Sequence, residues 1–294
     1  MQKIIDAILN VISYDSSVDI PKESFHKIEV LDQDLNIAFI DGGNAELMAS
    51  SDFSLHFIRV YCVVFNAERK LSKIKKEFYC LTSICDGKYV ADLFNGQKFI
   101  FDIDDSDLKQ GKERVDISLI GGCVRRLLEI ELALEVDSDV VVLDGSLQAK
   151  FALERDFMNK LEGKILMGVS KTSTELISGI SVIGVLHKSS KGLDYPWYCT
   201  VDGVSYAKFN KHSKYIFKVE FTENFLGSLI QNSKDYIFPG YPYGLFLADK
   251  YARVSNKEKD YLVTNLKVKF GKELVKLENC FTARNAHQVL DSVN

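Results

Sequence analysis

The hydrophobic pattern of this chain is dominated by short apolar runs that each end at a turn signal. The run 36–40 leads into Asp41, the run 140–143 leads into Asp144, and a glycine follows each aspartate. Continuous apolar runs of this length are typical of central strands that are buried on both faces. We therefore predict two buried strands that end at Asp41 and Asp144, where the glycines let a ligand approach the backbone.

The rest of the pattern alternates between β-rich runs and helical periodicity. Runs rich in β-branched and aromatic residues predict further strands, at 55–65, 75–82, 88–91, 98–102, 165–169, 215–221 and 266–270. Helices are predicted within the first 30 residues, over 117–136, over 148–161, and from Tyr241 to about Arg253 with a proline in the first turn.

This order of elements predicts one α/β domain over residues 1–294. A strand with Asp, a strand meander, a helix that carries Glu and a second strand with Asp form the ribonuclease-H-like arrangement, a mixed central sheet flanked by helices with peripheral additions. Residues 1–30 supply an N-terminal helix and connection, and about 256–294 form a C-terminal extension of the same domain. Internal repeats and convincing linkers are absent from the sequence.

Composition narrows the class of protein. The net charge of −4 does not indicate nucleic-acid binding, so any DNA contact must come from a local patch. The six cysteines form no C-x-x-C pair, which argues against a structural zinc site. No signal peptide is recognisable, and no apolar run approaches the ~20 residues of a membrane helix. We expect a cytoplasmic protein that has no contact with membranes.

The two strand-end aspartates suggest a metal site. Carboxylates on neighbouring strands repel each other unless a cation lies between them, and a divalent metal is the usual cation. In the ribonuclease-H-like arrangement the carboxylates meet at one sheet edge and bind two metals, about 4 Å apart, that support phosphodiester hydrolysis. The alternative for Asp41 and Asp144 is a turn role, because Asp-Gly is a common turn dipeptide.

Three segments of the chain resemble the NurA nuclease family, the partner of the HerA translocase, in their order and spacing. They are 40–43, then 125–129 with 143–147, and 241–252, so the resemblance covers about residues 35–255. It implies that Asp41, Asp144 and a glutamate on the intervening helix bind metal, and that Tyr241 approaches the scissile phosphate.

One position departs from the family pattern A-H-x-x-A, because Asp249 stands where the family usually has histidine. Aspartate is a harder oxygen ligand and could complete an all-carboxylate site. It could equally mark a weakened enzyme that has lost an imidazole able to shuttle a proton. A solvated ion pair between Asp249 and Arg253 at i,i+4 is a further alternative, and Tyr241 could be a packed aromatic residue.

The identity of the helix glutamate stays open at this point. On a helical wheel, Glu131 falls on the main apolar face and Glu129 points almost the other way. The R-x-x-E pattern of the family instead favours Glu129. Either residue could also pair with Arg125 or Arg126 on a solvated face.

Several lysines are candidates for DNA contact. Lys171 follows the strand 165–169, and Lys73 and Lys75 belong to a cluster with Lys70 and Lys76 that could track a DNA backbone. The alternative that we favour for Lys171 is an ordinary surface residue, and the cluster could be a charged strand edge that discourages aggregation.

The resemblance implies that the chain is a metal-dependent DNA nuclease that binds two Mn²⁺ or Mg²⁺ ions. Asp41, Glu129 (or Glu131), Asp144 and Asp249 would hold the ions. The resemblance further implies 5′-to-3′ exonuclease and single-strand endonuclease activity, a homodimer docked on a hexameric HerA-type ATPase, and a role in DNA end processing for repair or phage defence. A non-catalytic module that binds the motor, and an actin-like ATPase or kinase, are the other classes considered.

Overall fold

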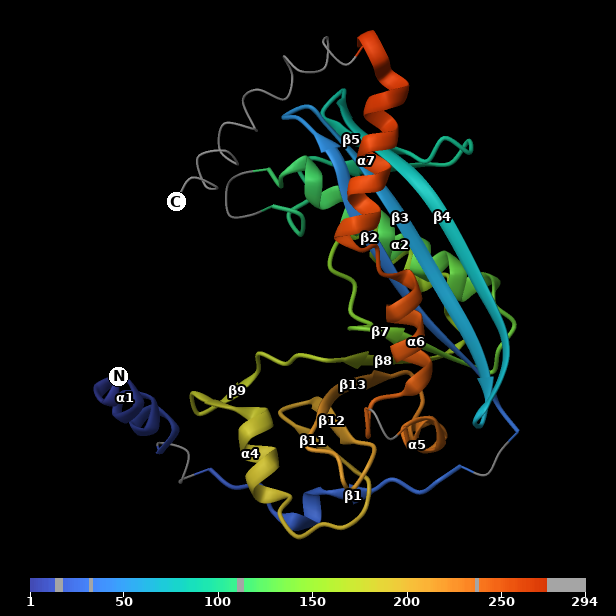
Figure 1. The fold of residues 1–294 in the computed structure, drawn as a ribbon. Helices are drawn as coiled ribbons and strands as arrows, with labels where there is room; N and C mark the ends of the chain where they lie inside the picture. Colours follow the sequence, from blue (N-terminus) through green and yellow to red (C-terminus); the bar gives the residue numbers. More distant parts are fainter. Residues whose placement is uncertain (14–17, 32–33, 110–113, 236–237, 274–294) are drawn as a thin grey trace.

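The chain is built around one large mixed sheet (Figure 1). The computed structural model describes residues 1–13, 18–31, 34–109, 114–235 and 238–273. Within them, 11 strands pair in the order β1-β11-β12-β13-β8-β7-β2-β3-β4-β5-β6, and β9 pairs with β10 separately. The strands are β1 (His26–Lys27), β2 (Asn36–Ala49), β3 (Phe53–Asn66), β4 (Arg69–Cys85), β5 (Lys88–Asp92), β6 (Lys98–Asp102), β7 (Val140–Asp144), β8 (Ile165–Ser170), β9 (Leu176–Ile177), β10 (Ile180–Ser181), β11 (Trp197–Val201), β12 (Val204–Lys208) and β13 (Phe217–Phe221).

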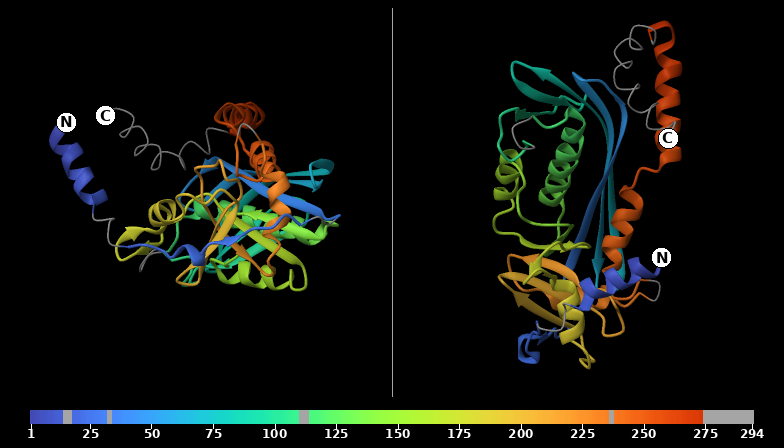
Figure 2. Two further views of the ribbon diagram at one scale, coloured as in Figure 1. Left: turned by 90° about the horizontal axis from the view of Figure 1, so that it is seen from below. Right: turned by 90° about the vertical axis from the view of Figure 1, so that its left-hand side faces the viewer.

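Helices cover both faces of the sheet. The α-helices are α1 (Gln2–Ser13), α2 (Ile120–Glu135), α3 (Ala152–Asn159), α4 (Val182–Ser189), α5 (Leu229–Asn232), α6 (Tyr243–Ala252) and α7 (Asn256–Phe270). Seen along the edge of β2–β4, α2 lies on one side and α6 and α7 lie on the other (Figure 2). Two large apolar clusters match these layers: one joins α2 to Ala38 and Ile40 of β2, and the other joins α6 to Phe39.

The centre of the sheet has the ribonuclease-H-like strand order. Strands β2, β3 and β4 form an antiparallel meander, β7 runs parallel to β2 on its other side, and β8 runs parallel to β7. Helix α2 makes the crossover that precedes β7. Strands β5 and β6 extend one edge, and β13, β12 and β11 extend the other. The predicted fold class, with its peripheral additions, is confirmed.

The first predicted strand does not end at Asp41. Strand β2 continues to Ala49 because it pairs with β3 along its length, with Asp41 opposite Tyr61. Its parallel pairing with β7 stops at Ile40 opposite Leu143. The edge at which Asp41 lies is therefore created by the end of β7, and not by the end of β2.

The strand predicted at 266–270 is wrong, because these residues belong to α7. The alternation that suggested a strand includes Val268, which is 75% exposed. Instead, Leu262, Leu266 and Phe270 repeat at a spacing of four and pack on the apolar cluster around Met48, which is the periodicity of a helix face.

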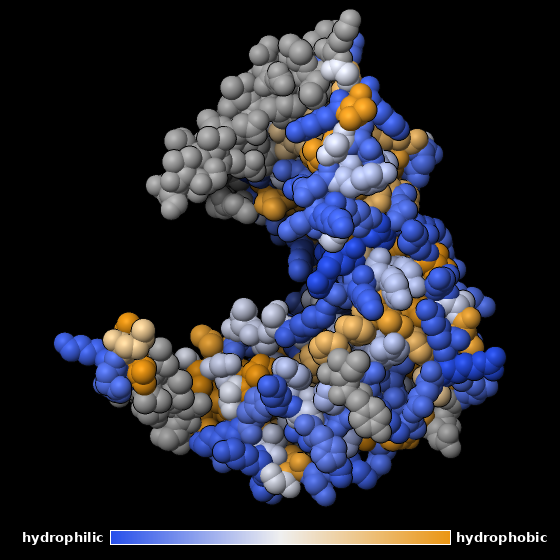
Figure 3. Space-filling model, viewed as in Figure 1, coloured by the Kyte–Doolittle hydropathy of each residue, from blue (hydrophilic) through white to orange (hydrophobic). Residues whose placement is uncertain are grey.

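Most other elements lie where the pattern predicts them, with shifted ends. Helix α3 spans only Ala152–Asn159 of the predicted 148–161, and the strand predicted at 215–221 begins at Phe217. Elements β1, β9–β12, α4 and α5 were not predicted. The molecule is hollowed between the part that contains the long strands with α7 and the part that contains β11–β13, and hydrophilic residues line the floor of this hollow (Figure 3).

Candidate metal centre

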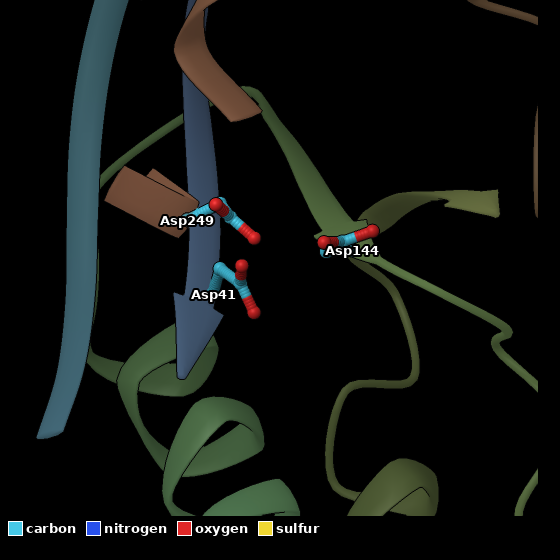
Figure 4. Close-up of side chains that lie close together, drawn as sticks. All are labelled: Asp41, Asp144 and Asp249. Carbon is cyan, nitrogen blue, oxygen red and sulfur yellow. The ribbon is translucent and has the colours of Figure 1, made fainter. Parts of the chain in front are cut away.

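Three aspartates converge where β7 ends. Side chains alternate between the two faces of a strand, so Asp41 shares its face with Phe39, and Asp144 shares its face with Val142. Both of these apolar residues pack in the cluster that contains α6, the helix that carries Asp249. One oxygen from each aspartate lies within 4.8 Å of the others. Figure 4 shows Asp41 and Asp249 side by side and facing Asp144.

Close backbone contact brings α6 to this position. Gly43 of β2 faces the last turn of the helix, and a Cβ on it would lie 2.4 Å from the carbonyl oxygen of Ala252. Only glycine allows this approach. Ala248 is fully buried against the sheet, which leaves its neighbour Asp249 at the rim. The small residues of α6 thus place a carboxylate beside those of β2 and β7.

Burial and like charge make the carboxyl group of Asp41 hard to ionise. Asp41 is 7% exposed, and its Oδ1 accepts a hydrogen bond of 2.7 Å from the backbone N–H of Gly42. Burial, followed by the charges of Asp144 and Glu129, raises the pKa of Asp41 to about 8. The site therefore favours a bound proton or a cation that offsets the excess negative charge.

Lys171 provides a cation within this site. It follows β8, and its Nζ lies 2.6 Å from Oδ2 of Asp144 and 3.1 Å from Oδ1 of Asp249. Burial acts to lower the pKa of Lys171, but contacts with the two aspartates raise it overall. Lys171 lies on the surface, with a side chain 42% exposed, and it is paired with two aspartates of the site. The i,i+4 ion pair of Asp249 with Arg253 is present as well, at 3.2 Å.

Tyr241 lies beside the three aspartates with an unsatisfied hydroxyl. Its Oη is buried and has no hydrogen-bond partner among the described residues. Burial, and then the charges of Asp144, Asp41 and Asp249, raise the pKa of Tyr241 above its ordinary value. The ammonium of Lys171 lies 5.4 Å from the centre of the tyrosine ring. Tyr241 is thus both a packed aromatic and a protonated donor next to the site.

On the opposite face of the sheet, α2 places Glu129 against β2. A Cβ on Gly42 would lie 2.6 Å from Oε1 of Glu129, so this glycine makes room for the carboxylate. Glu129 is 2% exposed and pairs with Arg125 and Arg126. Arg125 also donates to the carbonyl of Gly42 at 2.9 Å and lies 3.9 Å from Asp41. Glu129 is therefore an arginine partner, in a buried rather than a solvated setting.

Glu131 has a different environment. It accepts a hydrogen bond of 2.7 Å from Gln97, which lies between β5 and β6. The helical wheel favoured Glu131 as the carboxylate that faces the sheet, but the structure puts Glu129 there. The wheel fails because α2 is buried almost all round, so that both sides of the helix face protein.

Two further carboxylates support the site and were missed in the sequence. Glu154 is 1% exposed and accepts from Arg126, whose Nη2 donates to the carbonyl of Ser146 at 2.7 Å. Glu220 of β13 accepts from the Ser146 hydroxyl and from the backbone N–H of Leu147. These contacts fix the loop that follows Asp144. Nothing in the sequence distinguishes them from surface glutamates.

Lys73 and Lys75 lie away from the aspartates. They are exposed on β4, two strands from β2, which is about 10 Å across the sheet. Lys75 pairs with Glu77 at 3.0 Å. Along this part of β4 the outer edge has no partner strand among the described residues, because β5 pairs only with Leu81–Cys85.

The residues present fit divalent metal ions. Carboxylate oxygens are the ligands that Mg²⁺ and Mn²⁺ prefer, and three of them converge here. The high pKa of Asp41 and the position of Lys171 both indicate a site that attracts positive charge. The unpaired hydroxyl of Tyr241 could donate to a ligand held at the same place.

Comparison with known proteins identifies a similar domain and similar folds. Residues 35–178 match the NurA domain. The crystal structure of the NurA nuclease from Sulfolobus solfataricus has a TM-score of 0.61 and 15% sequence identity, over 92% of this chain and 95% of that chain. Endonuclease V from Ciona intestinalis, in complex with a DNA that contains inosine, has a TM-score of 0.46 and 11% identity over 87% of this chain and 98% of that chain. No curated protein matches the sequence.

The match spans Asp41, Glu129, Asp144 and Lys171, and the similarity to the Sulfolobus structure covers nearly the whole fold. None of the described helices is both long and apolar enough to cross a membrane. The chain therefore contains a NurA domain over residues 35–178, and its fold is similar to that of the Sulfolobus NurA nuclease.

Proposed function

We propose that this protein is a DNA nuclease that depends on divalent metal ions. The observation that carries the proposal is the convergence of three aspartates within 4.8 Å at the end of β7. Glu129, rather than Glu131, is the helix glutamate whose charge acts on Asp41, but its carboxylate is paired with Arg125 and Arg126. Asp41, Asp144 and Asp249 would hold Mn²⁺ or Mg²⁺. Bound ions of this kind lower the pKa of water and stabilise the leaving oxygen of a phosphodiester.

The remaining side chains have roles that follow from their positions. Tyr241 keeps its proton at all physiological pH values and can donate a hydrogen bond to a phosphate oxygen at the site. Lys171, released from Asp144 and Asp249 when ions bind, is close enough to neutralise the same phosphate. Arg125 and Arg126 both pair with Glu129, and Arg126 also holds the loop after Asp144 through the carbonyl of Ser146.

The finer features of the function rest on the resemblance to the NurA family. We propose cleavage of single-stranded DNA and of duplex ends in the 5′-to-3′ direction, by a homodimer that works with a HerA-type hexameric ATPase in DNA end processing. Lys73 and Lys75 on the open edge of β4 are candidates for contacts to a longer DNA strand.

One observation favours a second candidate, a module that binds the ATPase without turnover. Lys171 already contacts two of the three aspartates, so the cluster can be partly neutralised without metal. DNA cleavage decides between the two functions, because the module would bind the ATPase without turnover.

The test is cleavage of end-labelled single- and double-stranded DNA with Mn²⁺ or Mg²⁺, with and without the cognate ATPase. We expect metal-dependent cleavage by the wild type and its loss in Asp144→Asn. Asp202→Asn is the matched control, since Asp202 lies in the exposed turn between β11 and β12. If no DNA is cleaved even with the ATPase present, the nuclease function is refuted.

A further inference from the structure

An aromatic pocket opens beside the metal centre. It has a volume of about 600 Å³ and shares Lys171, Tyr241 and Asp249 with the site described above. The other lining residues are Tyr215, Phe217, Phe238, Phe246, Lys250 and Arg253. Five of the nine lining residues are therefore aromatic and three are cationic. The volume is that of a small-ligand site, for which about 300–1,000 Å³ is usual.

Two of the aromatic rings are partly exposed to solvent rather than buried. Tyr215 is 51% exposed and Phe238 is 44% exposed. The ring of Phe238 is held by Phe246, with centroids 4.8 Å apart and planes inclined by 33°. Lys214 places its ammonium 5.5 Å from the centre of the Tyr215 ring. These are supported aromatic faces beside positive charge, a combination that binds bases of single-stranded nucleic acid.

On the opposite side of the metal centre, the described residues offer no such faces. A second pocket of about 500 Å³ begins at Asp144 and is lined mainly by polar and charged residues, among them Arg125, Lys109 and Lys150. Its one aromatic residue, Phe151, is 4% exposed. A DNA strand that lies across the aspartates would therefore find cationic groups on both sides but, among the residues that the structure describes, exposed rings on one side only.

From this we infer that the aromatic pocket binds the base of an unpaired nucleotide adjacent to the phosphate at the aspartates, by stacking on Tyr215 and Phe238. The inference rests on the proposed nuclease function and deepens it by assigning a subsite for one unpaired base beside the cut. Lys250 and Arg253 are exposed at the same pocket and are placed to contact the neighbouring phosphates. A base paired within a duplex has no free face to offer the rings.

The test measures DNA binding with Ca²⁺ in place of Mn²⁺, so that turnover does not interfere. The probes are a fluorescent single-stranded oligonucleotide, the same strand with abasic sites, and a blunt duplex. Phe238→Ala and Tyr215→Ala should each weaken binding of the normal strand by about fivefold to a hundredfold. They should leave the abasic strand and the duplex unchanged.

Two further variants make the result specific. Phe238→Leu keeps an apolar side chain without an aromatic face and should bind as weakly as Phe238→Ala. Tyr261→Ala removes a 66% exposed aromatic residue from α7, outside the pocket, and should bind like the wild type. Full affinity in Phe238→Leu, or equal binding of normal and abasic strands by the wild type, would overturn the stacking proposal.

The two proposals fail in different ways. A protein that cleaves DNA with Mn²⁺ yet binds normal and abasic strands equally is a nuclease without a base pocket. A protein that prefers the normal strand through Phe238 but cleaves no DNA, even with the ATPase, has the pocket without the nuclease function.

Discussion

Replacing Lys171 with methionine tests whether this lysine competes with metal ions for the aspartates. Methionine keeps an unbranched apolar stem but removes the ammonium, which lies 2.6 Å from Asp144 and 3.1 Å from Asp249. In the metal-free protein Lys171 offsets part of the charge of the site. An ion that binds the same oxygens must displace it, so the variant should bind metal more tightly and be less stable without it.

The size of the effect follows from the contacts. A charge-assisted hydrogen bond contributes about 1.5–3 kcal/mol when buried, and an exposed ion pair about 0.2–1 kcal/mol. The Lys171 side chain is 42% exposed, so we take about 1–1.5 kcal/mol for the two contacts together. Affinity for Mn²⁺ should therefore rise about tenfold. The melting temperature in chelator should fall by about 2 °C.

The assay is calorimetric titration of the metal-stripped protein with Mn²⁺, together with thermal unfolding in EDTA. Lys250→Met is the matched control, because Lys250 is exposed on α6 beside Asp249 and carries the same charge. We expect its Mn²⁺ affinity to change far less than that of Lys171→Met. Unchanged or weaker Mn²⁺ binding in Lys171→Met would refute the reasoning and show that the lysine assists the ion.

Three more predictions concern charge at the same site. Because the pKa of Asp41 is raised to about 8, Asp41 keeps a proton in the folded metal-free protein that the unfolded chain releases at about pH 4. The free energy of unfolding of the metal-free protein should therefore fall as pH rises towards 8. Unfolding in EDTA across this range checks the slope, which Asp41→Asn should reduce. Asp249→His should lose more affinity for Mg²⁺ than for Mn²⁺, because imidazole is a poorer ligand for the harder ion, and paired titrations measure the ratio. Arg126→Met should destabilise the fold by about 3–5 kcal/mol, because the buried Glu154 loses its arginine partner and the buried Glu129 keeps only Arg125. In denaturant titrations the exposed Arg155→Met should lose under about 1 kcal/mol.

The sequence predicted the fold best at the buried central strands, where only apolar residues fit. The runs before Asp41 and Asp144 are apolar because both strands lie between two helical layers, and this pattern was enough to predict adjacent strands in a ribonuclease-H-like sheet. The sequence did not reveal that β2 runs on past Asp41. That continuation depends on the pairing of Gly42 to Ala49 with β3, a long-range contact with no local signal.

Periodicity failed where an element is buried on several sides or exposed on most. Helix α2 is apolar nearly all round, so a wheel could not show which of Glu129 and Glu131 faces β2. Helix α7 differs from α2, because none of its described residues is fully buried. Its polar and apolar positions at 266–270 alternate as they would in a strand.

The aromatic pocket had no signal in the sequence for a related reason. Tyr215, Phe238 and Phe246 stand in a stretch rich in aromatic residues, and composition alone does not separate exposed rings from core rings. Phe217, from the same stretch, is 6% exposed, whereas Tyr215 is 51% exposed. The difference arises because β13 begins between them, and it becomes visible only when the sheet is assembled.

The balance of charge argues that Asp249 strengthens the site for a cation rather than weakening the enzyme. The glutamate on α2 is already neutralised by two arginines, so the site charge depends on Asp41, Asp144 and Asp249 against Lys171. Three carboxylates and one ammonium leave an excess of two negative charges, which the exposed Arg253 offsets little. A neutral histidine in place of Asp249 would reduce that excess to one. With aspartate, the charge that remains matches a divalent ion. Until one binds, burial and then the charges of Asp144 and Glu129 raise the pKa of Asp41.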